Sequence, residues 1–244
     1  MRSGKITGPA GGTPTIFLDQ RSRRIVLQWS GAAFASAVVL RMPGAHAADV
    51  AEDFVGGDVV TVAGAVDLGG GDIGVLNYAY ALEQLEAAFY TEVIASPYSG
   101  MNDYEARILT DIRDHEVTHR EFLKGALGRR RIPDLEVDFS AIDFGSRRSV
   151  LTTARTFEDL GVSAYIGAGQ LLRNPDYLVA AGRIVSVEAR HAAVIRNTLE
   201  PFEEDFAGDD VVDRNGLDVS RLPSEVLPLA DPFIATPVSA SQLP

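Results

Sequence analysis

The stretch Glu116-Val117-Thr118-His119 has a counterpart later in the chain, Glu188-Ala189-Arg190-His191. In each, the His follows the Glu by three positions, so both side chains lie on one face of a helix with Cβ atoms ~5–6 Å apart. A carboxylate and an imidazole placed in this way can bind the same ion. Beyond residue 47 the chain has only three histidines, and two of them occur in this pattern.

Apolar residues flank both pairs at helical spacing. Ile112 and Leu123 surround the first pair, and Ile184 and Ile195 surround the second. Steps of three and four residues predict that each pair interrupts an apolar stripe that faces the core. A buried carboxylate is costly unless it is paired or bound to a metal. We therefore expect an ion or a partner group between these two helices.

Four long helices are predicted, over residues 72–94, 103–127, 147–172 and 175–200. Candidate N-caps precede or begin them: Asp72, Asn102, Ser146 and Asn174. Two connections are short and one is long. This pattern predicts an all-α, up-down four-helix bundle made of two helical hairpins joined by a long connection.

The other two predicted helices share a local pattern that contains a Glu. One reads Leu82-Glu83-Gln84-Leu85 with Tyr90 downstream, and the other reads Phe157-Glu158-Asp159-Leu160 with Tyr165 downstream. In both, the Tyr follows the Glu by seven positions, which is two helical turns along the same face. Each predicted hairpin therefore supplies a lone Glu and then a Glu-x-x-His.

Aligning the two hairpins distinguishes the inward carboxylate from its neighbours. Glu86 falls opposite Gly161, so Glu83 is the expected inward residue and Glu86 is expected on a solvated face. Tyr90 is a candidate catalytic residue, equally consistent with a core aromatic, whereas Tyr165 is expected to be a core aromatic. His115 is expected at the surface or just outside the ligands.

This set of residues resembles the ferritin-like superfamily, in which two helices each give a Glu and two each give a Glu-x-x-His to a pair of metal ions. The resemblance covers about residues 72–200 and is strongest to exported ferritin-like domain proteins, some of them linked to desiccation. It implies six metal ligands: Glu83, Glu116, His119, Glu158, Glu188 and His191. Each His would bind one ion, Glu116 and Glu188 would bridge the ions, and Glu83 and Glu158 would each cap one.

The resemblance also implies a cofactor and a reaction. The cofactor would be two Fe ions, with Mn as the alternative because both metals accept these ligands. The reaction would be ferroxidase-type oxidation of Fe(II) by O2 or peroxide, with manganese catalase-like chemistry left open. The chain has no Cys, which argues against a rubrerythrin-type peroxidase with its rubredoxin-like iron site.

Two other functions fit the same sequence. One is a non-catalytic stress- or desiccation-related scaffold protein without a functional metal. The other is an acidic surface that binds cations, for which the six residues would be irrelevant. Whether the protein is an enzyme and whether it forms a homo-oligomer are left open by the sequence.

Residues 1–47 are expected to be an export signal. Ser22-Arg23-Arg24-Ile25-Val26-Leu27-Gln28 resembles the twin-arginine motif, an apolar run follows to residue 40, and Ala45-His46-Ala47 resembles a cleavage site. The alternative is a transmembrane anchor, but the run is shorter and more polar than the ~20 apolar residues that a bilayer requires. We expect the twin-arginine machinery to export the chain to the periplasm or beyond, with no membrane segment after cleavage.

Charge and composition describe the remaining parts. The net charge is -12, but residues 1–47 hold six basic residues and one acidic residue, so the remainder carries 16 basic and 33 acidic residues. So acidic a remainder is a poor nucleic-acid binder. Residues 48–71 are expected to be a Gly-rich linker with a short strand at residues 59–62. Residues 201–244 form an acidic, Pro-rich tail in which little regular structure is expected.

Overall fold

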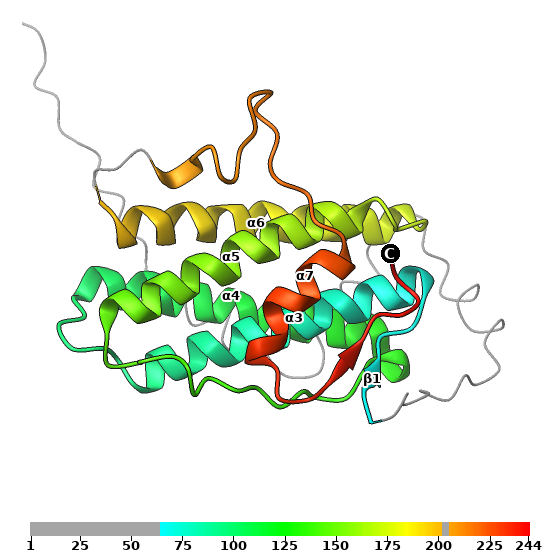
Figure 1. The fold of residues 1–244 in the computed structure, drawn as a ribbon, viewed down its shortest axis with the longest axis horizontal. Helices are drawn as coiled ribbons and strands as arrows, with labels where there is room; N and C mark the ends of the chain where they lie inside the picture. Colours follow the sequence, from blue (N-terminus) through cyan, green and yellow to red (C-terminus); the bar gives the residue numbers. More distant parts are fainter. Residues whose placement is uncertain (1–63, 202–204) are drawn as a thin grey trace, which may run out of the picture. The chain divides into compact units, whose positions relative to one another are not determined.

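A computed structural model describes residues 64–201 and 205–244, and four long helices form its core (Figure 1). They are α3 (Gly71–Ala95), α4 (Asp103–Leu127), α5 (Arg147–Gly169) and α6 (Pro175–Leu199). Helix α3 packs chiefly against α4, and α5 packs chiefly against α6. The predicted all-α bundle of two helical hairpins is therefore confirmed. In the described part of the chain, no helix is both long and apolar enough to cross a membrane.

Several sequence predictions concern residues that the structure does not describe. The expected export signal at residues 1–47, and the expected linker as far as residue 63 with its strand at residues 59–62, lie outside the described residues.

Side-chain caps begin three of the four helices, as predicted. The Asn102 side chain accepts hydrogen bonds from two backbone N–H groups of α4, and the Glu105 carboxylate accepts one from the Asn102 backbone N–H, which completes a capping box. Ser146 caps α5, and Asn174 caps α6 ahead of Pro175. These caps satisfy N–H groups that have no partner within the helix.

The prediction that Asp72 caps α3 is wrong. Gly70 occupies the N-cap position, and Asp72 lies in the first turn of the helix. Its carboxylate instead accepts hydrogen bonds from the backbone N–H groups of Arg173 and Asn174, at 2.8 and 2.9 Å. Asp72 therefore ties the start of α3 to the turn between α5 and α6.

Helix α3 is the central helix, and all of residues 74–87 are buried. A helix that is apolar on every side requires cover on every side. Two buried polar side chains of α3 hold the long connection against it. The Asn77 amide contacts the backbone of Arg130 and Ile132, and Gln84 accepts a hydrogen bond from Leu135 N. The connection between the hairpins thus follows α3.

The C-terminal segment lies along the bundle and is mostly irregular, as predicted. It contains the short helix α7 (Pro223–Ala230) and the strand β2 (Val238–Ser239), which pairs in parallel with β1 (Val66–Asp67). Val226 and Ala230 of α7 are fully buried, and α7 contacts α5 (Figure 1). The segment therefore contributes to the core.

A glycine allows this segment to approach α5 closely. A Cβ atom on Gly167 would lie 1.8 Å from the backbone oxygen of Arg221. The Arg221 N–H donates to the Ser163 carbonyl in the same place, at 3.0 Å. Because the obstruction is backbone, a side chain at position 167 would displace the segment.

We expect Gly167→Ala to lower the free energy of unfolding by about 1–3 kcal/mol, the usual cost of overpacking. Gly182→Ala in α6 is the matched control, because a Cβ there meets nothing within 4 Å. It should stabilise the protein by up to about 1 kcal/mol through helix propensity. Urea denaturation of both variants measures the difference. Equal effects of the two substitutions would contradict the close approach.

Candidate metal centre

Four glutamates and two histidines meet in the interior of the bundle, and every long helix contributes. Helix α3 supplies Glu83, α4 supplies Glu116 and His119, α5 supplies Glu158, and α6 supplies Glu188 and His191. All four glutamates are 0% exposed, and His191 is 4% exposed. So many ionisable groups can share a buried space only if their charges are balanced.

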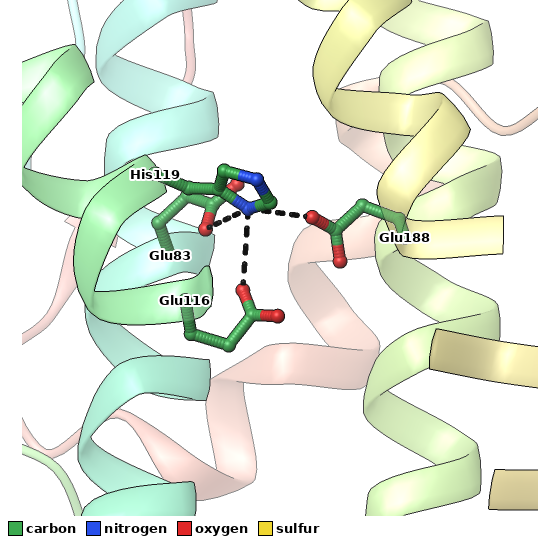
Figure 2. Close-up of side chains that lie close together, drawn as sticks. All are labelled: Glu83, Glu116, His119 and Glu188. Carbon is green, nitrogen blue, oxygen red and sulfur yellow. Dashed lines mark ion pairs between the residues drawn. The ribbon is translucent and has the colours of Figure 1, made fainter. Parts of the chain in front are cut away.

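The first group surrounds His119 (Figure 2). Its Nδ1 lies 2.8 Å from Glu188 Oε1, 3.5 Å from Glu83 Oε2 and 3.7 Å from Glu116 Oε2. One ligand atom from each of these four residues lies within 4.8 Å of all the others. We call this set the His119 position; it is able to hold one ion.

The second group surrounds His191. Its Nδ1 lies 2.8 Å from Glu116 Oε1 and 3.5 Å from both Glu158 Oε2 and Glu188 Oε2. These four residues also bring one ligand atom each within 4.8 Å of the others. We call this set the His191 position. Glu116 and Glu188 belong to both positions and turn a different oxygen to each, which is the geometry of a bridging carboxylate.

Two buried tyrosines orient the carboxylates that belong to one position only. Tyr165 donates to Glu83 Oε1, and Tyr90 donates to Glu158 Oε1, each at 2.5 Å. Burial and the neighbouring carboxylates raise the pKa of both tyrosines well above their ordinary value, so both hydroxyls keep their proton. Each bond leaves Oε2 of its glutamate directed into the cluster.

The buried atoms of the cluster that have no hydrogen-bond partner follow a simple pattern. They are Oε2 of Glu83 and Glu158, both carboxylate oxygens of Glu116 and Glu188, and Nδ1 of His119 and His191. Buried polar atoms are almost always hydrogen-bonded, so unpartnered ones point to a missing ligand. These are the atoms that a pair of cations would contact. Oxygen and imidazole donors of this kind suit Fe and Mn.

Protons take the place of cations when no ion is bound. Burial, reinforced by the charge of Glu188, raises the pKa of Glu116 well above its ordinary range, and burial raises that of Glu158 to about 7. Burial would also raise the pKa of Glu188, but the imidazoles of His119 and His191 lower it to about 2. Burial would lower the pKa of His191, yet the surrounding carboxylates raise it to about 12. The cluster therefore favours the binding of positive charge, either as protons or as metal ions.

The structure corrects two expectations about neighbouring residues. Glu86 was expected on a solvated face but is 3% exposed, because α3 is covered on all sides. Its Oε1 lies 2.9 Å from the point where a Cβ atom of Gly161 would stand, so the glycine makes room for the carboxylate. Tyr165 was expected to be only a core aromatic, yet it contacts Glu83 just as Tyr90 contacts Glu158.

His115 lies just outside the ligands, which is one of the two places expected for it. It is exposed, and its Nδ1 lies 2.9 Å from Nε2 of His191. The catalytic role of Tyr90 stays a prediction, as does ligation by the six residues that the structure brings together.

A four-helix bundle with a Glu-x-x-His on two helices and a lone Glu on each of the other two has the arrangement of the ferritin-like di-metal carboxylate proteins. The sequence model of the ferritin-like domain family matches residues 71–201. The match spans more than half of the 244 residues, so the chain belongs to this family. A search of curated proteins found no match to the chain.

Removing either tyrosine hydroxyl should weaken metal binding. Tyr90→Phe and Tyr165→Phe each leave one carboxylate oxygen buried without a donor and free its glutamate to turn. We expect each to lower the affinity for Co(II) about 10–100-fold, as is usual when a group that orients a ligand is lost. Isothermal titration calorimetry of the metal-free variants measures this. Tyr104→Phe is the control, since Tyr104 is 53% exposed, and an equal loss there would contradict the assignment.

Proposed function

We propose that the chain binds two iron ions, one at the His119 position and one at the His191 position, and oxidises Fe(II) with O2 or peroxide. The observation that carries the proposal is the set of unpartnered atoms in the cluster. Both carboxylate oxygens of Glu116 and of Glu188 lack a hydrogen-bond partner, whereas Glu83 and Glu158 each have one such oxygen. Such a set could bridge a pair of ions with Glu116 and Glu188 and cap each ion with one of the other two carboxylates.

Charge supports the number of ions. Four carboxylates carry four negative charges when ionised, and two divalent cations neutralise them while the imidazoles stay neutral. Two Fe(II) ions held by these residues would supply one electron each, enough to reduce O2 to H2O2, or H2O2 to two waters, with two protons taken up. Mn is the alternative metal, because the same ligands accept it.

Residues of the protein fix the geometry of the two metal positions. Glu116 and Glu188 set the separation of the two positions, while the tyrosine hydrogen bonds fix the terminal carboxylates. We assign Tyr90 a role beside the reacting centre, because its hydroxyl contacts Glu158 of the His191 position. Tyr165 has the matching place at Glu83 and shares the assignment.

We further propose that the twin-arginine machinery exports the protein to the periplasm or to the outside. Support comes from Ser22-Arg23-Arg24 with its apolar run and from Ala45-His46-Ala47. The absence of Cys agrees with a chain that folds before export, since no disulfide has to form afterwards. A link to desiccation rests on the sequence resemblance alone.

The metal content of the chain, produced through its own export route and freed of loose ions, tests the centre. We expect close to two Fe or Mn per chain by elemental mass spectrometry, and a near-complete loss in Glu116→Ala/Glu188→Ala. The control is Glu92→Ala/Glu121→Ala, which removes two exposed carboxylates from α3 and α4 and should keep both ions.

Activity separates the enzyme from the scaffold. The wild type should consume O2 or peroxide in the presence of Fe(II), and the Glu116→Ala/Glu188→Ala variant should not. A chain that contains no metal and also fails to bind added Fe(II) would refute the metal centre and favour the non-catalytic scaffold. A chain that binds two ions but consumes neither oxidant would refute the oxidation alone.

Metal binding should release protons. In the metal-free protein the carboxylates hold the pKa of His191 at about 12, so the ring carries a second proton at neutral pH. A metal ion can bind Nδ1 only after that proton leaves, hence affinity should rise as the pH is raised from 6 to 8. Calorimetry in two buffers of different ionisation enthalpy counts the protons. Binding without proton release would contradict this reasoning.

A further inference from the structure

The two metal positions are alike on the inner side of the cluster. Each uses one histidine Nδ1, one oxygen from each bridging glutamate and one terminal carboxylate. Each terminal carboxylate is held by a tyrosine at the same distance, 2.5 Å. Any difference between the positions must therefore come from outside this set.

The outer nitrogen of His191 is hydrogen-bonded to another histidine. Nε2 of His191 lies 2.9 Å from Nδ1 of His115, and the ring planes differ by 9° with centroids 5.1 Å apart. Rings stacked face to face cannot bring atoms much closer than ~3.5 Å. The two rings consequently lie edge to edge in nearly one plane, which directs the hydrogen bond along the lone pair.

His119 has no such partner. The residue four positions before His191, which corresponds to His115 in the second hairpin, is Val187. A valine side chain offers neither donor nor acceptor. Within residues 64–201 and 205–244, no hydrogen bond is found to Nε2 of His119. The His119 side chain is also more exposed, at 12% against 5% for His191.

We propose that His115 is a positioning residue that makes the two metal positions unequal, so that the His191 position binds its ion more tightly and fills first. The proposal rests on the metal centre proposed above and deepens it. It concerns the order of metal loading, which the six ligands alone leave undetermined.

The physical basis is the proton on the ring. An ion bound at Nδ1 of His191 would leave the proton on Nε2, which would donate to Nδ1 of His115, 2.9 Å away. This bond fixes the tautomer and orientation of His191 and makes its Nδ1 a better donor to metal. Losing such a partner typically costs 10–100-fold in metal affinity. The Nε2 atom of His119 has no such partner among the described residues, so no outer hydrogen bond fixes the tautomer of that ring.

Glu86 is the other departure from symmetry near the cluster. It occupies the place in the first hairpin that Gly161 has in the second, and its carboxylate lies against Gly161, one turn from Glu158. On its own helix Glu86 is also one turn from Glu83, so it lies near the terminal carboxylates of both positions, and the experiment must separate its effect from that of His115.

Stepwise titration of the chelator-treated full chain with Co(II), followed by visible absorbance and calorimetry, tests the proposal. We expect two binding steps, the first at least about 10-fold tighter. His119→Ala should keep the tight step and His191→Ala should lose it, which assigns the steps. His115→Ala should weaken the first step about 10–100-fold and leave the second unchanged. His115→Asn should restore most of the difference, because Oδ1 of Asn takes the place of Nδ1.

A spectroscopic readout separates positioning from a general structural effect. In the Co(II)-loaded protein, the Nε2–H proton of His191 should give a shifted NMR signal that exchanges slowly with water. This signal should exchange rapidly in His115→Ala, although that variant should keep the helix content and melting temperature of the metal-free wild type.

The outcomes that overturn the proposal differ from those that overturn the metal centre. Two ions bound with equal affinity, or an unchanged first step in His115→Ala, would refute the role of His115 while the centre stands. If Glu86→Gln removes the difference and His115→Ala does not, the inequality belongs to Glu86 and the proposal is wrong. No Co(II) binding at all would refute the centre itself.

Discussion

The burial of four carboxylates between the helices is the constraint on which the rest of the structure depends. Moving one such ion into a medium of low dielectric constant costs of order 20 kcal/mol in the ideal case and still several kcal/mol in real proteins. A whole domain is stable by only ~5–15 kcal/mol. The glutamates can therefore remain ionised at 0% exposure only beside compensating charge. Two histidines supply it when protonated, and two metal ions supply it more completely.

The remainder of the fold keeps these groups at fixed separations. Helix α3 is covered on every side, partly by the long connection that Asn77 and Gln84 hold in place. Next to Glu158 along α5, Asp159 pairs with Arg196 of α6, which is 2% exposed and also binds Asp210 of the C-terminal segment. This clamp joins α5, α6 and the segment close to the His191 position. The parts outside the bundle thus contribute to the rigidity that a two-ion site requires.

Local patterns explain what the sequence predicted correctly. The Glu-x-x-His spacing, the helix periodicity and the caps at Asn102, Ser146 and Asn174 each depend on residues within one or two turns. Contacts between different helices could not be predicted from these local patterns. Tyr165 was misjudged because its partner, Glu83, belongs to another helix, and Asp72 because its partners lie in the turn between α5 and α6. The burial of Glu86 was not predicted either. Its place opposite Gly161 could have indicated it, because a glycine leaves room for a buried carboxylate.

Two residues near the cluster, His115 and Glu86, break the symmetry between the two hairpins. His115 and Glu86 both belong to the first hairpin, yet His115 contacts His191 of the second, and Glu86 lies against Gly161 one turn from Glu158. The corresponding residues of the second hairpin, Val187 and Gly161, offer no polar side chain to the first. Tyr90 and Tyr165 exchange equivalent bonds between the hairpins, and beyond these the first hairpin adds His115 to a ligand of the second, where the second offers only Val187. In a site whose inner ligands match pair for pair, the hydrogen bond between His115 and His191 is therefore the outer contact, among the described residues, that belongs to the His191 position alone.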